Sequence, residues 1–233
     1  MSYQASAEAV RIAEQSGDSY SKAAAYTWHG FSFLLKGLLE EAERYLMEGV
    51  DFGKRLNHSM FLAMAHDGLG ETYFEIGEYE KSKDHYSEAI WLKENAGFFP
   101  SWTNLSKIGL ARAKVMNNEK DIEPRSLYGY VAKNKTKIYD GSMRRYIGEI
   151  LLSIDDQHMS EAEEWIKKAI ESDKRNGAMW NLGMDHAICA ELFKRKGDRS
   201  KAKENFCKAI ETFKECGADG WAEKAEQELA TLS

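Results

Sequence analysis

The chain has 233 residues, of which 43% are hydrophobic and 30% charged, with only 2 prolines and a net charge of −6. This composition excludes a disordered chain and predicts a helical protein with a large core. The negative charge disfavours binding to nucleic acid or to an acidic membrane surface, and no apolar run approaches the about 20 residues of a membrane span. The three cysteines form no Cys-x-x-Cys pair, so neither a disulfide framework nor a zinc site is predicted and a cytoplasmic location is expected.

One short pattern recurs six times at a spacing of 40 residues, without insertion or deletion. One of its columns always holds a small residue, the next holds a large residue that is mostly β-branched or aromatic, and a third is Gly or Asn at all but one place. Strict recurrence at this period is typical of stacked repeat proteins. The column of small residues contains Ala9, Gly49, Ala89, Gly129, Ala169 and Ala209.

The chain begins halfway through a repeat. Residues 1–17 correspond to the second helix of a unit whose first helix is missing, so the apolar stripe that includes Val10 and Ile12 lacks an upstream partner. We favour the interpretation that the chain is the C-terminal fragment of a longer protein. The alternative is a homo-oligomer formed through this open helix. Residues 218–233 are predicted to form a terminal capping helix with Trp221 directed inward.

Each full unit contains two segments of about 16–18 residues that end at Gly or Asn, such as Gly17 and Gly37. These residues supply the left-handed conformation that caps a helix C-terminus. Each unit is therefore predicted to consist of helix A, a tight turn, helix B and a loop. The predicted full units are 18–57, 58–97, 98–137, 138–177 and 178–217, within a single domain over 1–233.

The second unit carries a resemblance to a known family. Eight of its residues match the tetratricopeptide repeat (TPR) at every spacing: Leu69, Gly70, Tyr73, Gly77, Tyr79, Ser82, Tyr86 and Ala89. The resemblance implies an all-α fold, a right-handed α-solenoid of antiparallel helix pairs with about 12 helices. The lengthened units are similar to the C-terminal TPR arms of bacterial multidomain signalling regulators of the ATPase or cyclase type.

The pattern is weakest in the third and fourth units. Ile122 and Ser126 occupy positions that are small and aromatic elsewhere, and Lys137 replaces the capping glycine. Pro124 is tolerated only in a first helical turn. We expect the stack to be looser or bent between residues 117 and 142.

The sequence contains no phosphate loop, no His-Glu-x-x-His and no Gly-x-Ser-x-Gly motif, so no catalytic residue, cofactor or metal is predicted. His66 and His186 share a column with Tyr26 and Tyr146, which favours packed aromatic rings over ligands. The segment 155–158 is interpreted as a solvated turn and not as a metal site.

In TPR arrays, as the resemblance implies, helix A residues line a concave groove that holds a peptide. The charges at the matching positions change from acidic in the second unit to basic in the third and fourth, which would orient an amphipathic partner. The candidate partner-binding residues are Phe31, Met64, Asp67, Glu71, Phe74, Asn104, Lys107, Lys114, Arg144, Ile147, Met184 and Lys194.

The sequence thus predicts a non-enzymatic interaction scaffold that binds a protein or peptide and forms the C-terminal arm of a larger cytoplasmic regulator. Two alternatives remain open. One is a small-molecule sensor whose site surrounds Phe31, Phe74 and Trp102. The other is a self-association module. The sequence does not identify the partner.

Overall fold

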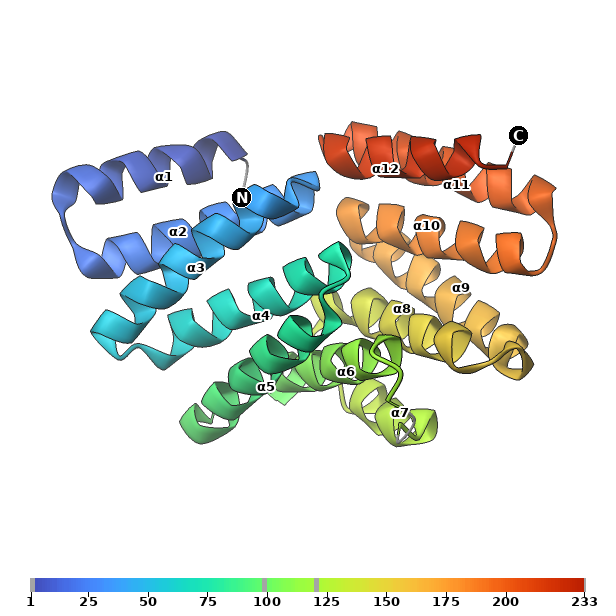
Figure 1. The fold of residues 1–233 in the computed structure, drawn as a ribbon, viewed down its shortest axis with the longest axis horizontal. Helices are drawn as coiled ribbons and strands as arrows, with labels where there is room; N and C mark the ends of the chain where they lie inside the picture. Colours follow the sequence, from blue (N-terminus) through green and yellow to red (C-terminus); the bar gives the residue numbers. More distant parts are fainter. Residues whose placement is uncertain (1–2, 98–99, 120–121, 233) are drawn as a thin grey trace. The chain divides into compact units, whose positions relative to one another are not determined.

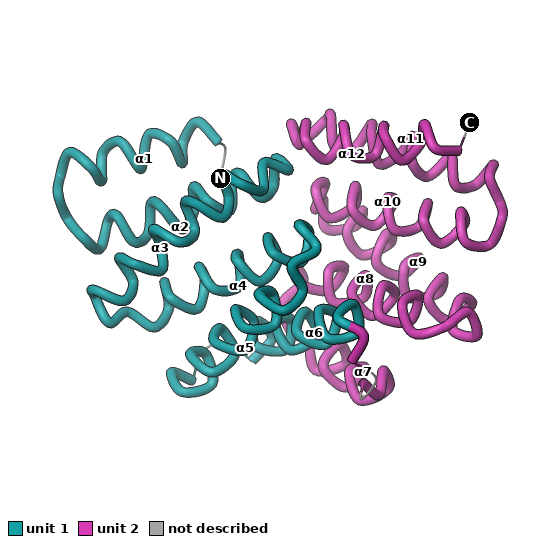
Figure 2. The backbone as a smooth tube through the Cα atoms, in the orientation of Figure 1, with its two compact units in different colours: residues 1–117 teal, residues 118–233 magenta. Residues whose placement is uncertain are grey.

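The computed structural model describes residues 3–97, 100–119 and 122–232. Over these ranges the chain forms twelve α-helices and one short 3-10 helix, with no strand (Figure 1). The predicted all-α class is therefore confirmed. The helices fall into two compact units, residues 1–117 and 118–233 (Figure 2). The interpretation of 1–233 as a single domain stays a prediction.

Unit 1 alternates B and A helices. Neighbouring helices in the sequence pack on each other, and the A helix α4 also contacts the A helices α2 and α6. This unit contains α1 (Tyr3–Ser16), α2 (Ser19–Lys36), α3 (Leu39–Leu56), α4 (Ser59–Ile76), α5 (Tyr79–Ala96) and α6 (Pro100–Met116).

Unit 2 repeats the same order of B and A helices. Its A helices α8 and α10 contact each other as well as their B partners. This unit contains α7 (Pro124–Ala132), α8 (Lys137–Ile154), the 3-10 helix η1 (Asp156–His158), α9 (Met159–Asn176), α10 (Met179–Arg195), α11 (Arg199–Glu215) and α12 (Asp219–Ala230).

Most of the helices end where the sequence places left-handed caps, and α7 and α8 are exceptions. Gly37 ends α2 with φ of 80°, and its N–H donates to backbone carbonyls of the last turn. Asn57 ends α3 with φ of 50°, a conformation that Asn tolerates better than most side chains. The repeat is thus marked at both of its turns by residues that stop the preceding helix.

The weak repeat differs from the predicted pattern, since α7 has nine residues where 16 to 18 were expected. Pro124 occupies the first turn, and Glu123 accepts a hydrogen bond from the Arg125 N–H at the N-cap. The helix ends at Lys133 with φ of −86°, so the left-handed cap is missing. The expected bend between residues 117 and 142 stays a prediction.

Small residues let paired helices approach closely. A methyl group at Gly70 of α4 would lie 2.9 Å from the Tyr86 ring of α5, and one at Gly30 of α2 would lie 2.6 Å from the Leu46 side chain of α3. Both distances are shorter than carbon atoms tolerate, so larger residues would force the helices apart. The side chains of the B helices therefore fill the space that these glycines leave.

We predict that Gly70→Ala lowers the free energy of unfolding by about 1–3 kcal/mol, because the added methyl group collides with Tyr86. The matched control is Gly129→Ala in α7, where a methyl group meets no atom within 4 Å. That control should raise helix stability by up to about 1 kcal/mol. Urea unfolding followed by circular dichroism measures both, and a change of the same sign in the two variants would contradict the packing argument.

Candidate functional site

Every candidate residue lies on an A helix. Phe31 is on α2 and four further candidates are on α4, while α6, α8 and α10 carry the others. All but two are partly exposed; the exceptions, Glu71 and Ile147, are buried. Ile147 has no exposed surface and belongs to the core of unit 2, so its assignment to a partner-binding surface is not retained.

Glu71 is held by a buried ion pair between successive A helices. Its Oε2 atom accepts hydrogen bonds from Nη2 of Arg112 at 2.7 Å and from the Tyr86 hydroxyl at 2.5 Å. The Arg112 guanidinium also lies 3.5 Å from the ring centroid of Phe74. Two of the candidates, Glu71 and Phe74, thus help to fix α4 against α6.

Asp67 belongs to a second buried pair. Its Oδ2 atom accepts from the Lys93 ammonium at 2.6 Å, and its Oδ1 atom accepts from the Ser106 hydroxyl at 2.6 Å. Burial lowers the pKa of Lys93, and the Asp67 carboxylate opposes that shift. The ammonium group also lies 4.5 Å from the ring centroid of Trp102. Asp67 therefore links all three helices from α4 to α6.

These pairs change the expected electrostatics of unit 1. Asp67 and Glu71 are neutralised by buried cations, so they do not offer the free acidic surface that their positions suggested. Sequence reasoning missed Lys93 as a functional neighbour. A signal was present, because the same column holds Ala13 and Gly53 in the preceding repeats and a lysine at such a small, buried position requires a partner.

An apolar surface remains on α2. Trp28 is 44% exposed and Leu35 is 39% exposed, at helical spacings that place them on the same side as the candidate Phe31. The rings of Trp28 and Phe31 have centroids 6.0 Å apart. Phe31 also lies over α4, 3.1 Å from the position of a Cβ on Gly68. We call Trp28, Phe31 and Leu35 the α2 apolar surface.

The basic candidates of unit 2 are paired with acids. Arg144 donates to Oδ1 of Asp140 at 3.0 Å. Lys194 donates to Glu228 of α12 at 2.8 Å and lies 3.5 Å from Glu191. These contacts stabilise packing within unit 2 and reduce the charge that Arg144 and Lys194 can offer to a partner.

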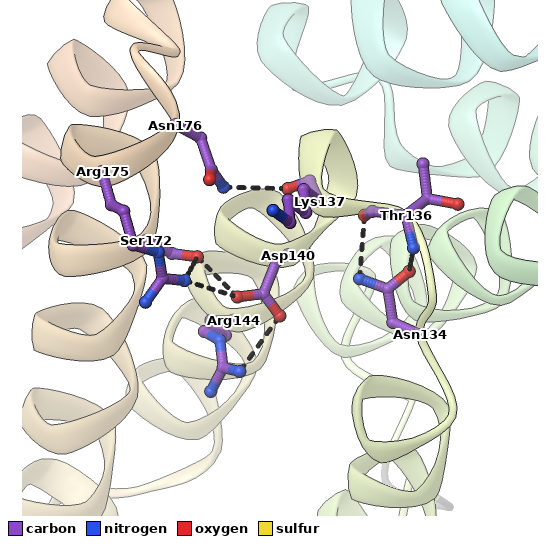
Figure 3. A network of polar contacts seen from close by, with 8 residues as sticks. All are labelled: Asn134, Thr136, Lys137, Asp140, Arg144, Ser172, Arg175 and Asn176. Carbon is purple, nitrogen blue, oxygen red and sulfur yellow. Dashed lines mark hydrogen bonds and ion pairs between the residues drawn. The ribbon is translucent and has the colours of Figure 1, made fainter.

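A polar network joins the start of α8 to the end of α9 (Figure 3). Asp140 accepts hydrogen bonds from Arg144 and from the Ser172 hydroxyl, and Asn176 donates to the Lys137 carbonyl at 3.1 Å. Burial acts to raise the pKa of Asp140, but these donors hold it below its usual value. In the loop before α8, Asn134 and Thr136 bond to each other through backbone and side-chain atoms. The network fixes α8 where a glycine cap is absent.

Two histidines, the buried His66 and the partly exposed His85, form a pair in unit 1. The Nδ1 atoms of His66 and His85 lie 2.9 Å apart, so one ring donates and the other accepts. Tyr73 stacks on His85 with centroids 5.2 Å apart. Burial, with smaller contributions from His85 and Lys54, lowers the pKa of His66 to about 4, and burial also lowers the pKa of His85. His66 is therefore a packed ring, as its column predicted.

Over the described ranges, no group of three or more His, Cys, Asp or Glu residues could hold a metal ion. His158 bonds to Asp155 at 2.8 Å in the turn before α9. Nor does any helix within the described part of the chain have the length and apolarity to cross a membrane.

Residues 65–95, which span most of α4 and α5, match the tetratricopeptide repeat family. The fold resembles the apo form of RapI with a TM-score of 0.72, over 91% of this chain and 76% of that chain, at 17% identity. YrrB, described as a TPR protein with an unusual peptide-binding site, aligns at 0.43 over 96% and 100% of the two chains with 20% identity. BtubC (BKLC) from P. vanneervenii aligns at 0.38 over 98% and 87% with 13% identity.

No curated protein matches the sequence. The fold is thus that of an all-α helical-repeat protein, and the repeat formed by α4 and α5 is of the TPR type. The similarity to arms of ATPase or cyclase regulators stays a prediction.

We predict that Arg112→Met lowers the free energy of unfolding by about 3–5 kcal/mol, because it removes one partner from a buried ion pair. Lys114→Met, two positions along α6 and partly exposed, is the control and should change stability by less than about 0.5 kcal/mol. Adding Glu71→Gln to Arg112→Met should restore part of the loss. Urea unfolding measures all three, and equal losses for the Arg112 and Lys114 variants would contradict the role of the pair.

We predict that acid destabilises the protein through His66 and His85. Because their folded pKa values lie below 6.5, the stability that they contribute is present above that pH and is lost as the pH falls toward about 4. His85→Asn copies the pair of His186 and Asn205, which lie 3.2 Å apart at the equivalent positions of unit 2. Between pH 7 and pH 4.5, the free energy of unfolding of this variant should fall by about 1 kcal/mol less than that of the wild type.

Urea titrations at the two pH values measure this difference. If the wild type and His85→Asn lose the same free energy of unfolding between the two pH values, the histidine pair does not titrate as its burial requires.

Proposed function

We propose that this protein is a non-enzymatic interaction scaffold that binds a peptide or protein through the A helices, with the α2 apolar surface as the main contact in unit 1. The observation that carries the proposal is the pair of large apolar side chains, Trp28 and Leu35, exposed on an A helix next to a TPR-type repeat. Exposed aromatic residues on a rigid helix are frequent energetic centres of protein interfaces.

The chemistry of the surface favours an apolar partner. Full burial of a large apolar side chain contributes about 1.5–3 kcal/mol, and binding would bury the part of Trp28 and Leu35 that is still exposed. Phe31 packs on Gly68 of α4. The surface is therefore preorganised and loses little conformational entropy on binding. Since Asp67 and Glu71 are neutralised internally, we propose that a bulky apolar or aromatic side chain of the partner contacts α2, with the partly exposed Met64 at the edge.

We propose a smaller role in binding for the remaining candidate residues. On α6, Asn104, Lys107 and Lys114 are partly exposed, and Lys107 is paired with Glu94 at 2.6 Å. In unit 2, Met184 is a partly exposed apolar residue on α10. We propose that these residues adjust specificity, while the α2 apolar surface supplies most of the affinity.

We further propose that the protein is cytoplasmic and acts as the interaction arm of a larger regulator. Two alternatives are carried forward. The first is a small-molecule ligand bound around Phe31, Phe74 and Trp102 in place of a peptide. A second copy of the chain could pack on α1, where Ile12 is 53% exposed.

The test uses the full chain as bait against a displayed library of random peptides. An enriched peptide is then synthesised and its dissociation constant is measured by calorimetry. We predict that Trp28→Ala and Phe31→Ala each weaken binding at least about tenfold, as expected for an interface hot spot. The matched control is Trp91→Ala: Trp91 is 59% exposed but lies on the B helix α5, so the control should change binding by less than twofold.

Each other outcome has a defined meaning. Enriched peptides that bind equally to all three variants would reject the α2 apolar surface as the binding site. If no peptide is enriched, the peptide proposal fails. A metabolite that raises the melting temperature of the wild type but not of Phe31→Ala would then support the sensor alternative.

A further inference from the structure

Unit 2 contains a buried cluster of charges of a kind that unit 1 lacks in its described residues. Asp173 of α9, Asp185 of α10 and Arg145 of α8 are all buried with no exposed surface. Nη1 of Arg145 lies 3.2 Å from Oδ1 of Asp185, and Nε of Arg145 lies 3.3 Å from Glu149. One guanidinium is thus shared between the carboxyl groups of Asp185 and Glu149.

The carboxyl groups have too few hydrogen-bond donors. Both oxygens of Asp173 and the Oδ2 atom of Asp185 are buried and accept no hydrogen bond within the ranges that the structure describes. A buried, ionised carboxylate without a donor is costly. The Asp173 and Asp185 side chains interact directly, so the two carboxyl groups cannot easily both be ionised. The cluster therefore lacks either a cation or a proton.

The charged groups that face the cluster are few. Helix α8 contributes Arg145 with Glu149, and also Asp140, whose charge adds to the unfavourable field at Asp173. Helix α10 contributes Asp185. The other cations nearby, Arg144 and Arg175, interact with Asp140. The balance of charge at Asp173 is therefore negative.

The packing around Asp173 leaves no room for a larger neighbour. A methyl group at Gly141 of α8 would lie 2.1 Å from the Asp173 carboxyl group. A proton is the smallest species that can remove the excess charge. It also supplies a donor for one of the carboxyl oxygens.

We propose that Asp173 and Asp185 share one proton in the folded protein, so that the packing of α9 against α8 and α10 is strengthened by mild acid and weakened above neutral pH. This proton site is independent of the peptide-binding proposal. It gives the helices that carry Arg144, Met184 and Lys194 a stability that depends on pH.

The pKa values agree with this arrangement. Burial raises the pKa of Asp173 to about 6, against the opposing effect of Arg145, and burial raises the pKa of Asp185 well above its usual value. A group with a raised folded pKa stabilises the protein below its unfolded pKa and loses this contribution as the pH rises through the folded pKa. The direction is opposite to that of the histidine pair in unit 1.

The cluster is specific to unit 2. Three repeat periods earlier, unit 1 has Ala25, Gly53 and Ala65 at the positions of Arg145, Asp173 and Asp185. All three of these small residues are buried. The helical fold therefore does not need the charged residues, and their presence together in unit 2 points to a role beyond packing.

The test measures amide hydrogen exchange of the full chain by mass spectrometry at pH 5 and pH 8, corrected for intrinsic exchange rates. We expect protection in peptides from α8 and α9 to fall about tenfold between these pH values, as linkage gives for one proton with a pKa of 3.8 unfolded and about 6 folded. Peptides from α10 are left out of this comparison because they contain His186, whose pKa is lowered by burial and which acts in the opposite direction. Peptides from α3 to α5, next to the histidine pair, should not lose protection over this rise in pH.

Two variants test whether Asp173 and Asp185 are the carboxyl groups that hold the proton. Asp173→Asn supplies a permanent donor to Asp185, so it should raise protection at pH 8 at least tenfold and abolish the decrease between pH 5 and pH 8. Asp156→Asn, which removes an exposed carboxyl group from η1, is the matched control and should keep the wild-type profile.

Constant protection in wild-type α8 and α9 across this range would overturn the proposal. Lower protection in Asp173→Asn than in the wild type at pH 8 would also overturn it. If Asp173→Asn does not fold, the carboxyl ¹³C shifts of the wild-type aspartates decide. Titration of all of them below pH 5 would exclude the shared proton.

Discussion

Close contact between paired helices at small residues is the constraint on which the rest of this structure depends. Gly30 and Gly70 leave space for Leu46 and Tyr86 from the following B helices, and Gly148 does the same for Ile166 in unit 2. Because helix pairs pack at this distance, each repeat buries its A helix on one side and leaves the other side available. The exposure of Trp28 and Leu35 follows from this arrangement.

Charged residues in the core hold neighbouring helices together. The pairs of Glu71 with Arg112 and of Asp67 with Lys93 hold α4, α5 and α6 together in unit 1. Isolated buried pairs add little net stability, but removal of one partner is costly. Such pairs therefore favour one register of the repeats over others, and they leave apolar side chains to bind partners.

Each unit holds a pair of titratable core residues, and the two pairs respond to pH in opposite directions. His66 and His85 must stay neutral, so acid opposes the folding of unit 1. Under the proposal above, Asp173 and Asp185 hold a proton, so mild acid favours the folding of unit 2. The same repeat architecture thus allows opposite responses of stability to pH, because each response depends on only a few core residues.

The sequence by itself determined the helical class, the repeat period and the caps, because these depend on local spacing and on residues such as Gly37 and Asn57. It also placed the candidate residues on A helices. Only the tertiary structure decided that Ile147 is buried, that Lys93 neutralises Asp67, and that Trp28 is exposed. Such facts depend on which side chains from distant repeats meet in space, and a periodic pattern specifies the stacking of helices without specifying the partner of each side chain.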